Sequence, residues 1–205
     1  MKQPILLLLI PSLILNAILL VREQKAKETD GVGVISVYDG DTLILDNKER
    51  LRLRQLDAPE LTFCGGADAK EALEKLVSGK RVRISQQIPD QQGRGMAFVY
   101  VGDTLVNKEL LSRGLVRFHH DSTPLNDELK AAADLAKEQK LGIFGSCRSM
   151  TNAKNPKCTI KGNIDRQRKT YHVSGCTQYP FTVVEEDIGE AWFCTEKEAQ
   201  KAGYI

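Results

Sequence analysis

The sequence has no strong excess of charge of either sign. Lysine and arginine together number 29 and aspartate and glutamate 27, so the formal net charge is only +2. This balance excludes an argument for a nucleic-acid partner from overall charge, and any such partner has to be inferred from a local site. With 205 residues, 41% of them hydrophobic, the chain is long enough for one ordinary globular domain with appendages, but not for two full-sized domains.

The N-terminal segment lacks charge after Lys2 and lacks a small-x-small cleavage site before Arg22. Its apolar run, residues 4–21, is close to the ~20 residues that span a bilayer. We therefore interpret residues 1–29 as an export signal retained as a membrane anchor, followed by a polar linker, with removal of the signal and secretion as the alternative. Both readings place the rest of the chain outside the cytoplasm. The basic residues after the run argue mildly against this orientation by the positive-inside rule.

From Val32 the pattern changes to short extended runs interrupted by helices. In RLRLRQL, residues 50–56, period-two alternation places Leu51 and Leu53 on a core-facing side and Arg52 and Arg54 on the other. Five short strands with an inserted helix indicate an α+β, mainly β, domain over residues 30–146: a five-stranded Greek-key barrel of the oligonucleotide-binding (OB-fold) type with three helices. The strands are predicted at 32–37, 42–45, 50–56, 81–84 and 96–101, and the helices at 67–78, 107–113 and 124–141.

The C-terminal part lacks the length to fold on its own. Residues 147–157 are polar without periodicity and are interpreted as a linker. Residues 158–205 are interpreted as a small unit that ends in a helix, because Thr195 and Glu198 form a capping-box pattern and Gly203 is a stop signal. Fewer than about 50 residues rarely fold on apolar burial alone. This unit therefore needs a metal, a disulfide or contact with the barrel.

Four carboxylates lie at two predicted strand ends. Asp39 and Asp41 are in the turn YDGDT, and Asp57 and Glu60 are in LDAPE directly after the third strand. Each fragment taken alone is also consistent with an ordinary turn or strand end that has no role in binding. If the first and third strands are neighbours, however, the two clusters converge on one surface, where carboxylate and carbonyl oxygens can bind a hard cation such as calcium.

Two arginines complete a pattern typical of phosphodiester hydrolysis. Arg52 precedes Asp57 on the third strand, and Arg94 lies between glycines in QQGRGM. Guanidinium groups and a divalent cation stabilise charge on phosphate oxygens, while a carboxylate activates or orients the attacking water. Taken alone, either arginine is equally consistent with a surface residue paired with an acid.

The fragments VYDGDTLIL, RLRQLDAPE, GRGMAFVY and VNKELLSRGL, in this order and spacing, resemble the staphylococcal nuclease (thermonuclease) family over about residues 32–141. The resemblance implies a calcium-dependent nuclease, acting as a monomer on DNA or RNA, that leaves 3′-phosphate ends. It implies that Glu60 activates water and that Arg52 and Arg94 hold the scissile phosphate. It also implies three calcium ligands: Asp41, Asp57 and the backbone carbonyl of Ala58. The alternative is a weak or inactive nucleic-acid-binding module of the same fold, although such relatives typically lose this acid and arginine set.

The sequence departs from the family pattern around the substrate. Gln91 and Gln92 stand where the prototype has lysine and tyrosine, and His120 stands where a later loop has tyrosine. Aromatic side chains stack on bases. We therefore expect weaker or differently selective substrate binding.

The five cysteines are an odd number, which excludes complete disulfide pairing within one chain. Four residues of the small unit provide a candidate Cys3His zinc site: Cys158, His172, Cys176 and Cys194. They do not form a double CxxC pattern, and exported cysteines more often oxidise than bind metal, so zinc and disulfides both remain open. With a zinc site in the small unit, Cys64 and Cys147 are left to bridge the loop after Glu60 and the end of the last barrel helix.

Overall fold

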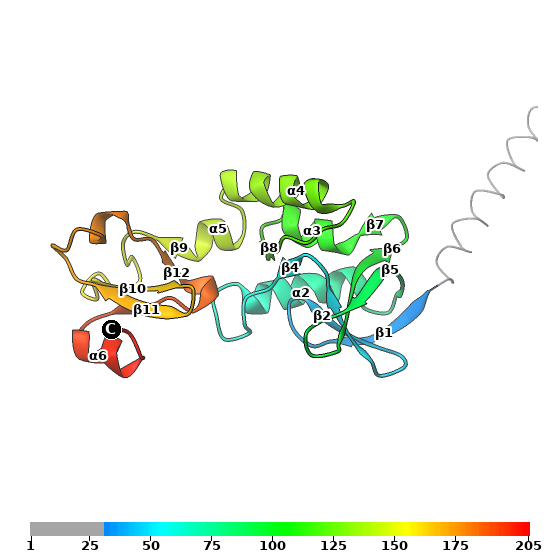
Figure 1. Ribbon diagram of the computed structural model, residues 1–205, viewed down its shortest axis with the longest axis horizontal. Helices are drawn as coiled ribbons and strands as arrows, with labels where there is room; N and C mark the ends of the chain where they lie inside the picture. The colour runs from blue at the N-terminus through cyan, green and yellow to red at the C-terminus, as the bar shows by residue number, and fades with distance from the viewer. Residues whose placement is uncertain (1–30) are drawn as a thin grey trace, which may run out of the picture.

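The computed structural model describes residues 31–205. A barrel with its helices and a smaller C-terminal unit lie end to end along the long axis of the molecule (Figure 1). The expected anchor, residues 1–29, lies outside the described residues. None of the helices within residues 31–205 has both the length and the apolar character needed to cross a bilayer.

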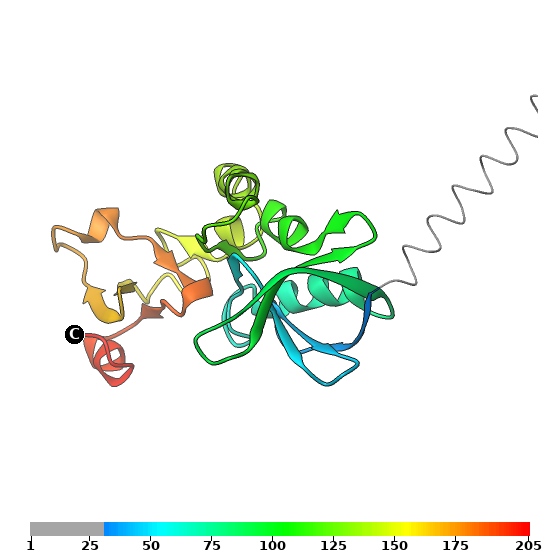
Figure 2. The same ribbon diagram turned by 45° about the vertical axis from the view of Figure 1, so that its right-hand side comes forward.

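Five strands form a closed barrel, as predicted. Strands β1, β2 and β3 form an antiparallel meander, β1 also pairs with β5, and β5 pairs with β6. A parallel pairing between β3 and β6, with Leu53 opposite Ala97, closes the ring, which is seen as strands curling around a common interior in Figure 2. The strands are β1 (Val32–Val37), β2 (Thr42–Leu45), β3 (Arg50–Leu53), β5 (Arg81–Pro89) and β6 (Gly95–Val101), and the two-residue β7 (Thr104–Leu105) pairs with β6.

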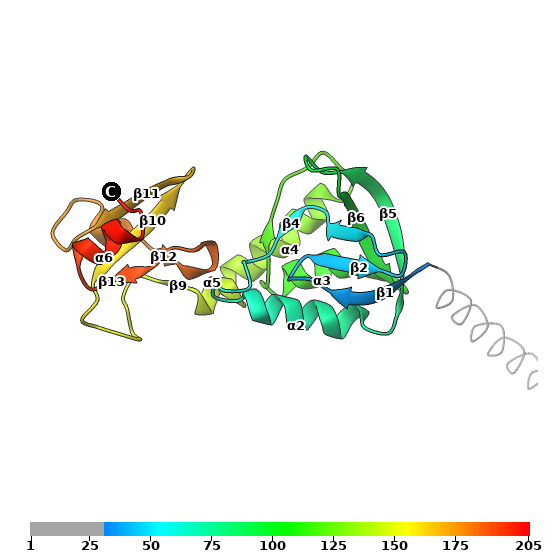
Figure 3. The same cartoon turned by 90° about the horizontal axis from the view of Figure 1, so that it is seen from below.

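The barrel interior follows from the alternation in the sequence. Leu51 and Leu53 are fully buried, as expected for the inward side of β3, and Phe98 is the largest fully buried side chain. The three predicted helices are present as α2 (Gly66–Val77), α3 (Val106–Ser112) and α4 (Asn126–Glu138), and α2 runs alongside β1 (Figure 3). Helix α4 is shorter than predicted. It stops before Lys140, which has a positive φ of 55° that a helix cannot accommodate.

The third predicted strand breaks into two. Gln55 has a positive φ of 62°, so β3 ends at Leu53 and a separate short strand, β4 (Leu56–Asp57), follows. Strand β4 leaves the barrel and pairs with β8 (Arg117–Phe118), which the sequence indicates only as an extended piece. The break changes the direction of the chain immediately before Asp57.

The C-terminal unit is built from short strands. Its elements are a three-stranded sheet of β10 (Ile160–Asp165), β11 (Arg168–His172) and β13 (Trp192–Phe193), two 3-10 turns, η1 (Tyr179–Phe181) and η2 (Glu186–Ile188), and helix α6 (Glu196–Lys201). Thr195 caps α6 as predicted, because its hydroxyl accepts a hydrogen bond from the Glu198 N–H at 3.2 Å. The Glu198 carboxylate accepts a hydrogen bond from the Cys194 N–H at 2.9 Å. In a standard capping box it would accept from the N–H of the cap residue itself, Thr195.

The segment expected to be a linker takes part in the fold. Helix α5 (Ile143–Ser146) ends at the buried Cys147, and β9 (Arg148–Ser149) pairs with β12 (Val184–Glu185) of the C-terminal unit. The first residues of 147–157 thus connect the two bodies through a backbone pairing.

Two disulfides are present, and they correct the zinc prediction. Cys64 is bonded to Cys147, as the sequence suggested, and Cys158 is bonded to Cys194. The second bond consumes two of the four candidate zinc ligands. The other two, His172 and Cys176, remain as a pair with Nδ1 and Sγ 3.7 Å apart. Two ligands are too few for a structural zinc site, so the structure does not support zinc in this unit.

Candidate active site

The two acid-bearing turns meet because β2 pairs with β3. Thr42 lies opposite Arg52, so the turn before β2, which carries Asp41, lies beside the outgoing end of β3. The Leu53 N–H donates to the Asp41 carbonyl at 2.7 Å and fixes this approach. From the sequence, convergence was expected if the first and third strands were neighbours. The structure places β2 between them. The carboxylates converge because the turn that carries Asp41 joins β1 to β2, and β2 pairs with β3.

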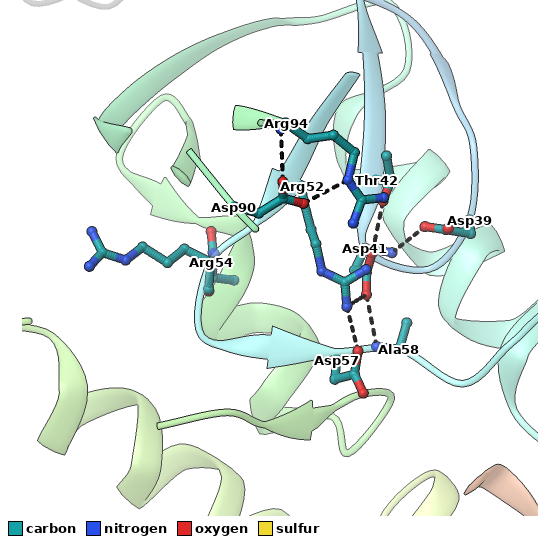
Figure 4. A network of polar contacts seen from close by, with 10 residues as sticks. Asp39, Asp41, Thr42, Arg52, Arg54, Asp57, Ala58, Asp90 and Arg94 are labelled. Carbon is teal, nitrogen blue, oxygen red and sulfur yellow. Dashed lines mark hydrogen bonds and ion pairs between the residues drawn. The ribbon is translucent and has the colours of Figure 1, made fainter. Parts of the chain in front are cut away.

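Arg52 connects the two carboxylates directly (Figure 4). Its Nη2 lies 2.8 Å from Asp41 Oδ2 and also donates to Asp57 Oδ1. Asp57 is exposed, with 66% of its side chain accessible, whereas Asp41 is only 3% accessible. One buried and one solvent-facing carboxylate therefore share a single guanidinium nitrogen.

Asp41 is a buried carboxylate whose charged form is stabilised by a nearby positive charge. Burial raises its pKa to about 6, although Arg52, the Ala58 N–H at 3.0 Å and the Thr42 hydroxyl at 2.8 Å all favour the charged form. A divalent cation beside Asp41 would favour that charged form further. Asp41, Asp57 and the carbonyl of Ala58 are oxygen donors of the kind calcium prefers, so these residues fit the predicted ion. Within residues 31–205 no group of three or more His, Cys, Asp or Glu side chains forms a metal cluster, so the ion would depend also on the backbone carbonyl and on water.

Arg94 is held by its own turn. Asp90 Oδ1 accepts hydrogen bonds from the N–H groups of Gln92 and Arg94, both at 2.8 Å, and Asp90 Oδ2 accepts from Arg94 Nε at 2.7 Å. Burial alone would raise the pKa of Asp90, but these hydrogen bonds lower it, so the carboxylate is charged. The terminal nitrogens of Arg94 make no hydrogen bond to the part of the chain that the structure describes. They are therefore available to a ligand.

Arg52 and Arg94 face one cavity of about 480 Å³, whose lining does not include Glu60. Asp57 lines this cavity and also a second one of about 190 Å³, whose wall includes the exposed Glu60. Of the residues predicted from sequence, Asp41, Arg52 and Asp57 are in direct contact, and Arg94 faces Arg52 and Asp57 across the larger cavity. Glu60 adjoins them through the shared Asp57.

Comparison with known proteins identifies the family of this chain. Residues 50–146 match the sequence model of a family described as "Staphylococcal nuclease homologue". An uncharacterized endonuclease of Haemophilus influenzae is 31% identical over 134 residues, which cover 62% of this chain and 74% of that protein. The chain belongs to the staphylococcal nuclease family.

The matches to other relatives cover different shares of those proteins. A thermonuclease of Staphylococcus intermedius is 32% identical over 114 residues, which cover 50% of this chain and 67% of that protein. A probable staphylococcal-like nuclease of Oryza sativa subsp. japonica is 31% identical over 105 residues, which cover 51% of this chain but only 31% of the plant protein. The chain thus spans about a third of this plant relative. The residues matched by the family model end at 146, before the C-terminal unit.

Two residues of this staphylococcal nuclease barrel were missed from the sequence as parts of the site. Arg54 lines the same cavity as Arg52, although its side chain extends away from Arg52 in Figure 4 and is largely buried. Its Nε lies 2.5 Å from Asp121 Oδ2, and its hydrogen bond lowers the pKa of that carboxylate. The second is Asp90, which orients Arg94. Asp90 could have been recognised, because an aspartate commonly accepts a hydrogen bond from the backbone N–H two residues later in a turn. No pattern in the neighbouring sequence indicates that Arg54 pairs with Asp121.

Proposed function

We propose that this chain is a calcium-dependent nuclease that hydrolyses phosphodiester bonds of DNA or RNA. The observation that carries the proposal is the contact of Arg52 with both Asp41 and Asp57, with Arg94 facing the same cavity. Surface arginines normally pair with one acid and contribute little. Here an arginine, a buried acid and an exposed acid are gathered at the edge of a cavity large enough for a nucleotide.

The two arginines bind the scissile phosphate. Arg94 is fixed through Nε by Asp90, so its remaining nitrogens are oriented without further loss of side-chain freedom. Arg52 reaches the same cavity from the barrel strand. Guanidinium groups on the non-bridging oxygens stabilise the charge that develops there as the phosphorus is attacked.

Glu60 accepts a proton from the attacking water. The new bond joins the water oxygen to phosphorus, and the bond from phosphorus to the 5′-oxygen breaks. The leaving 5′-oxygen takes a proton from solvent water and Glu60 returns its proton to solvent, so the products are a 3′-phosphate and a 5′-hydroxyl. Asp41, Asp57 and the Ala58 carbonyl would hold the calcium ion, which would supply positive charge to stabilise the transition state. Glu60 has access to solvent water because it lies on the exposed loop after β4.

Recognition in this site depends on phosphate more than on base. Gln91, Gln92 and His120 line the larger cavity, and its walls within residues 31–205 include no Phe, Tyr or Trp. Without an aromatic platform the stacking contribution to binding is lost, which in other proteins is about 1–3 kcal/mol per base. We therefore propose low sequence selectivity and strong dependence on salt.

We further propose that the chain acts as a monomer outside the cytoplasm, tethered by its N-terminal segment or secreted. Two disulfides support this location, since such bonds persist in oxidising compartments. Cell fractionation with protease protection tests it. Protein found only in the cytoplasm would contradict the proposal.

The catalytic proposal is tested with Glu60→Gln. We expect kcat on DNA and RNA to fall at least about a hundredfold, as for removal of a general base, with thermal unfolding unchanged. Glu138→Gln, an exposed glutamate at the end of α4, is the matched control and should cleave normally. Product ends are analysed for 3′-phosphate, with and without a calcium chelator.

Three results would contradict this proposal: full cleavage in chelator, normal turnover by Glu60→Gln, or 5′-phosphate ends. A wild-type protein that binds nucleic acid without cleaving it would instead support the alternative of a binding module.

A further inference from the structure

The C-terminal unit contacts the barrel beside the acid-bearing loop. Strand β12 and turn η2, residues 184–188, lie between the bulk of the C-terminal unit and the barrel (Figure 1). From there Asp187 receives two hydrogen bonds from Arg117 of the barrel, from Nε at 2.6 Å and from Nη2 at 3.0 Å. Glu185 accepts a third from Nη2 at 2.9 Å. The Asp187 side chain is completely buried in this contact.

Arg117 lies directly opposite Asp57. The two residues are register partners in the pairing of β4 with β8. In an antiparallel pair, residues that face each other have their Cβ atoms about 4.5–5.5 Å apart on the same side of the ladder. Both residues also line the smaller cavity together with Glu60 and Asp187. Arg117 is therefore a cation within reach of the proposed calcium ligand Asp57 and the proposed base Glu60.

The guanidinium of Arg117 is charged, and its Nε and Nη2 are bonded to the C-terminal unit. Burial by itself would lower its pKa, but the hydrogen bonds and charges of Asp187 and Glu185 outweigh burial and raise it. A bidentate pairing with a buried carboxylate fixes the orientation of a guanidinium more strongly than a single contact does. In this orientation Arg117 makes no ion pair with Asp57 or Glu60 within the described chain.

We infer that Asp187 is a positioning residue of the nuclease site, which holds Arg117 away from Asp57 and Glu60. An arginine released from Asp187 would pair with Asp57, its neighbour across the ladder, and compete with the cation for that carboxylate. The C-terminal unit, which the family match does not include, would then be part of the catalytic apparatus. This inference rests on the proposed function.

A second contact keeps the same segment in place. The ring of Phe63, three residues after Glu60, packs on Gly189, where an added Cβ would lie 2.7 Å from the ring. On the other side the Glu186 N–H donates to the carbonyl of Cys147 at 2.8 Å, and Cys147 is bonded to Cys64 of the Glu60 loop. The segment that holds Arg117 is thus fixed to the loop that carries Glu60.

The test compares Asp187→Asn with Glu186→Gln in the full chain. Glu186 is the adjacent carboxylate and pairs with Lys154 at 3.0 Å instead of with Arg117, so it is a matched control. We expect Asp187→Asn to bind calcium about tenfold more weakly, in a titration without nucleic acid, because a nearby cation competes for a carboxylate. We also expect a lower kcat with little change in KM. Glu186→Gln should match wild type in both.

The double variant Arg117→Met/Asp187→Asn separates positioning from structural support. It removes the released cation and the buried acid together, so calcium affinity and kcat should return to near wild type. Trp192 fluorescence and thermal unfolding of each variant show whether the C-terminal unit is folded.

The inference is overturned if the double variant is no better than Asp187→Asn, or if Asp187→Asn behaves like Glu186→Gln. In both cases the failure is distinct from that of the proposed function, which is judged from cleavage by wild type and Glu60→Gln, the effect of chelator and the product ends.

Discussion

The barrel and the C-terminal unit are stabilised in different ways. The barrel buries apolar side chains from all five strands and from α2, α3 and α4 around Phe98. The core of the C-terminal unit has three buried residues, Ile160, Ala199 and Tyr204. Within the described residues this small core is supplemented by the Cys158 to Cys194 disulfide, by buried charged side chains and by contacts with the barrel.

Buried polar groups also have different roles in the two bodies. In the barrel, buried Asp41 and Arg54 belong to or border the site. In the C-terminal unit they replace an apolar core: Lys161 Nζ donates to the carbonyls of Tyr179 and Thr182 at 2.9 and 2.7 Å, and Glu190 accepts from the Ile164 N–H at 2.7 Å. Apolar cores tolerate rearrangement, whereas buried polar networks are costly when one partner is missing. The two bodies should therefore fail under different substitutions.

The largest effect is expected for Phe98→Ala in the barrel. Phe98 is fully buried, and its loss should destabilise the barrel by about 3–5 kcal/mol. The measurement is thermal unfolding followed by far-ultraviolet circular dichroism. The same change at Phe193, a partly buried residue of the C-terminal unit whose ring lies 5.1 Å from that of Tyr204, should cost less and should be seen mainly by Trp192 fluorescence. Equal losses would contradict the contrast between the two cores.

The next effect is expected for the double substitution Cys158→Ser/Cys194→Ser. Removing a native disulfide from a small unit typically costs about 2–5 kcal/mol, and little apolar burial is available to compensate. We expect Trp192, the one tryptophan of the sequence, to report unfolding of the C-terminal unit while the barrel strands remain folded. Cys176→Ser, which removes the free thiol, is the control. An unchanged Trp192 transition in the double variant would show that contact with the barrel suffices.

Sequence patterns predicted the barrel well because its signals are local. Alternation in β3 placed Leu51 and Leu53 inside, and glycine stops and helical periodicity located α2 and α3 to within a residue or two. The break at Gln55 was not predicted, since a positive φ at a glutamine has no sequence signature. Asp41 and Asp57 do meet at Arg52, but through β2, which lies between the two strands expected to be neighbours.

The C-terminal unit was harder to predict because its stabilising contacts join distant residues. The pairing of Cys158 with Cys194 cannot be deduced from cysteine spacing alone, which left zinc open. The ion pair of Arg117 with Asp187 joins residues 70 positions apart, and neither lies in a motif. Such a contact depends on how the two bodies pack, so only the coordinates show it.

The smallest effect is expected from the titration of Glu190. Burial raises the pKa of this carboxyl above its ordinary value, and the N–H groups of Ile164 and Glu185, which favour the charged form, only partly offset burial. An acid whose pKa is raised on folding binds its proton more tightly in the folded state, so its contribution to stability decreases as pH rises through the interval from the unfolded to the folded pKa. The C-terminal unit of wild type should thus lose stability relative to Glu190→Gln over the pH range above about 4.5. Denaturant unfolding followed by Trp192 fluorescence at several pH values measures this difference. A stability difference that stays constant over that range would mean that the pKa of Glu190 is the same in the folded protein as in water. Burial of the charged carboxylate in this unit would then cost little free energy.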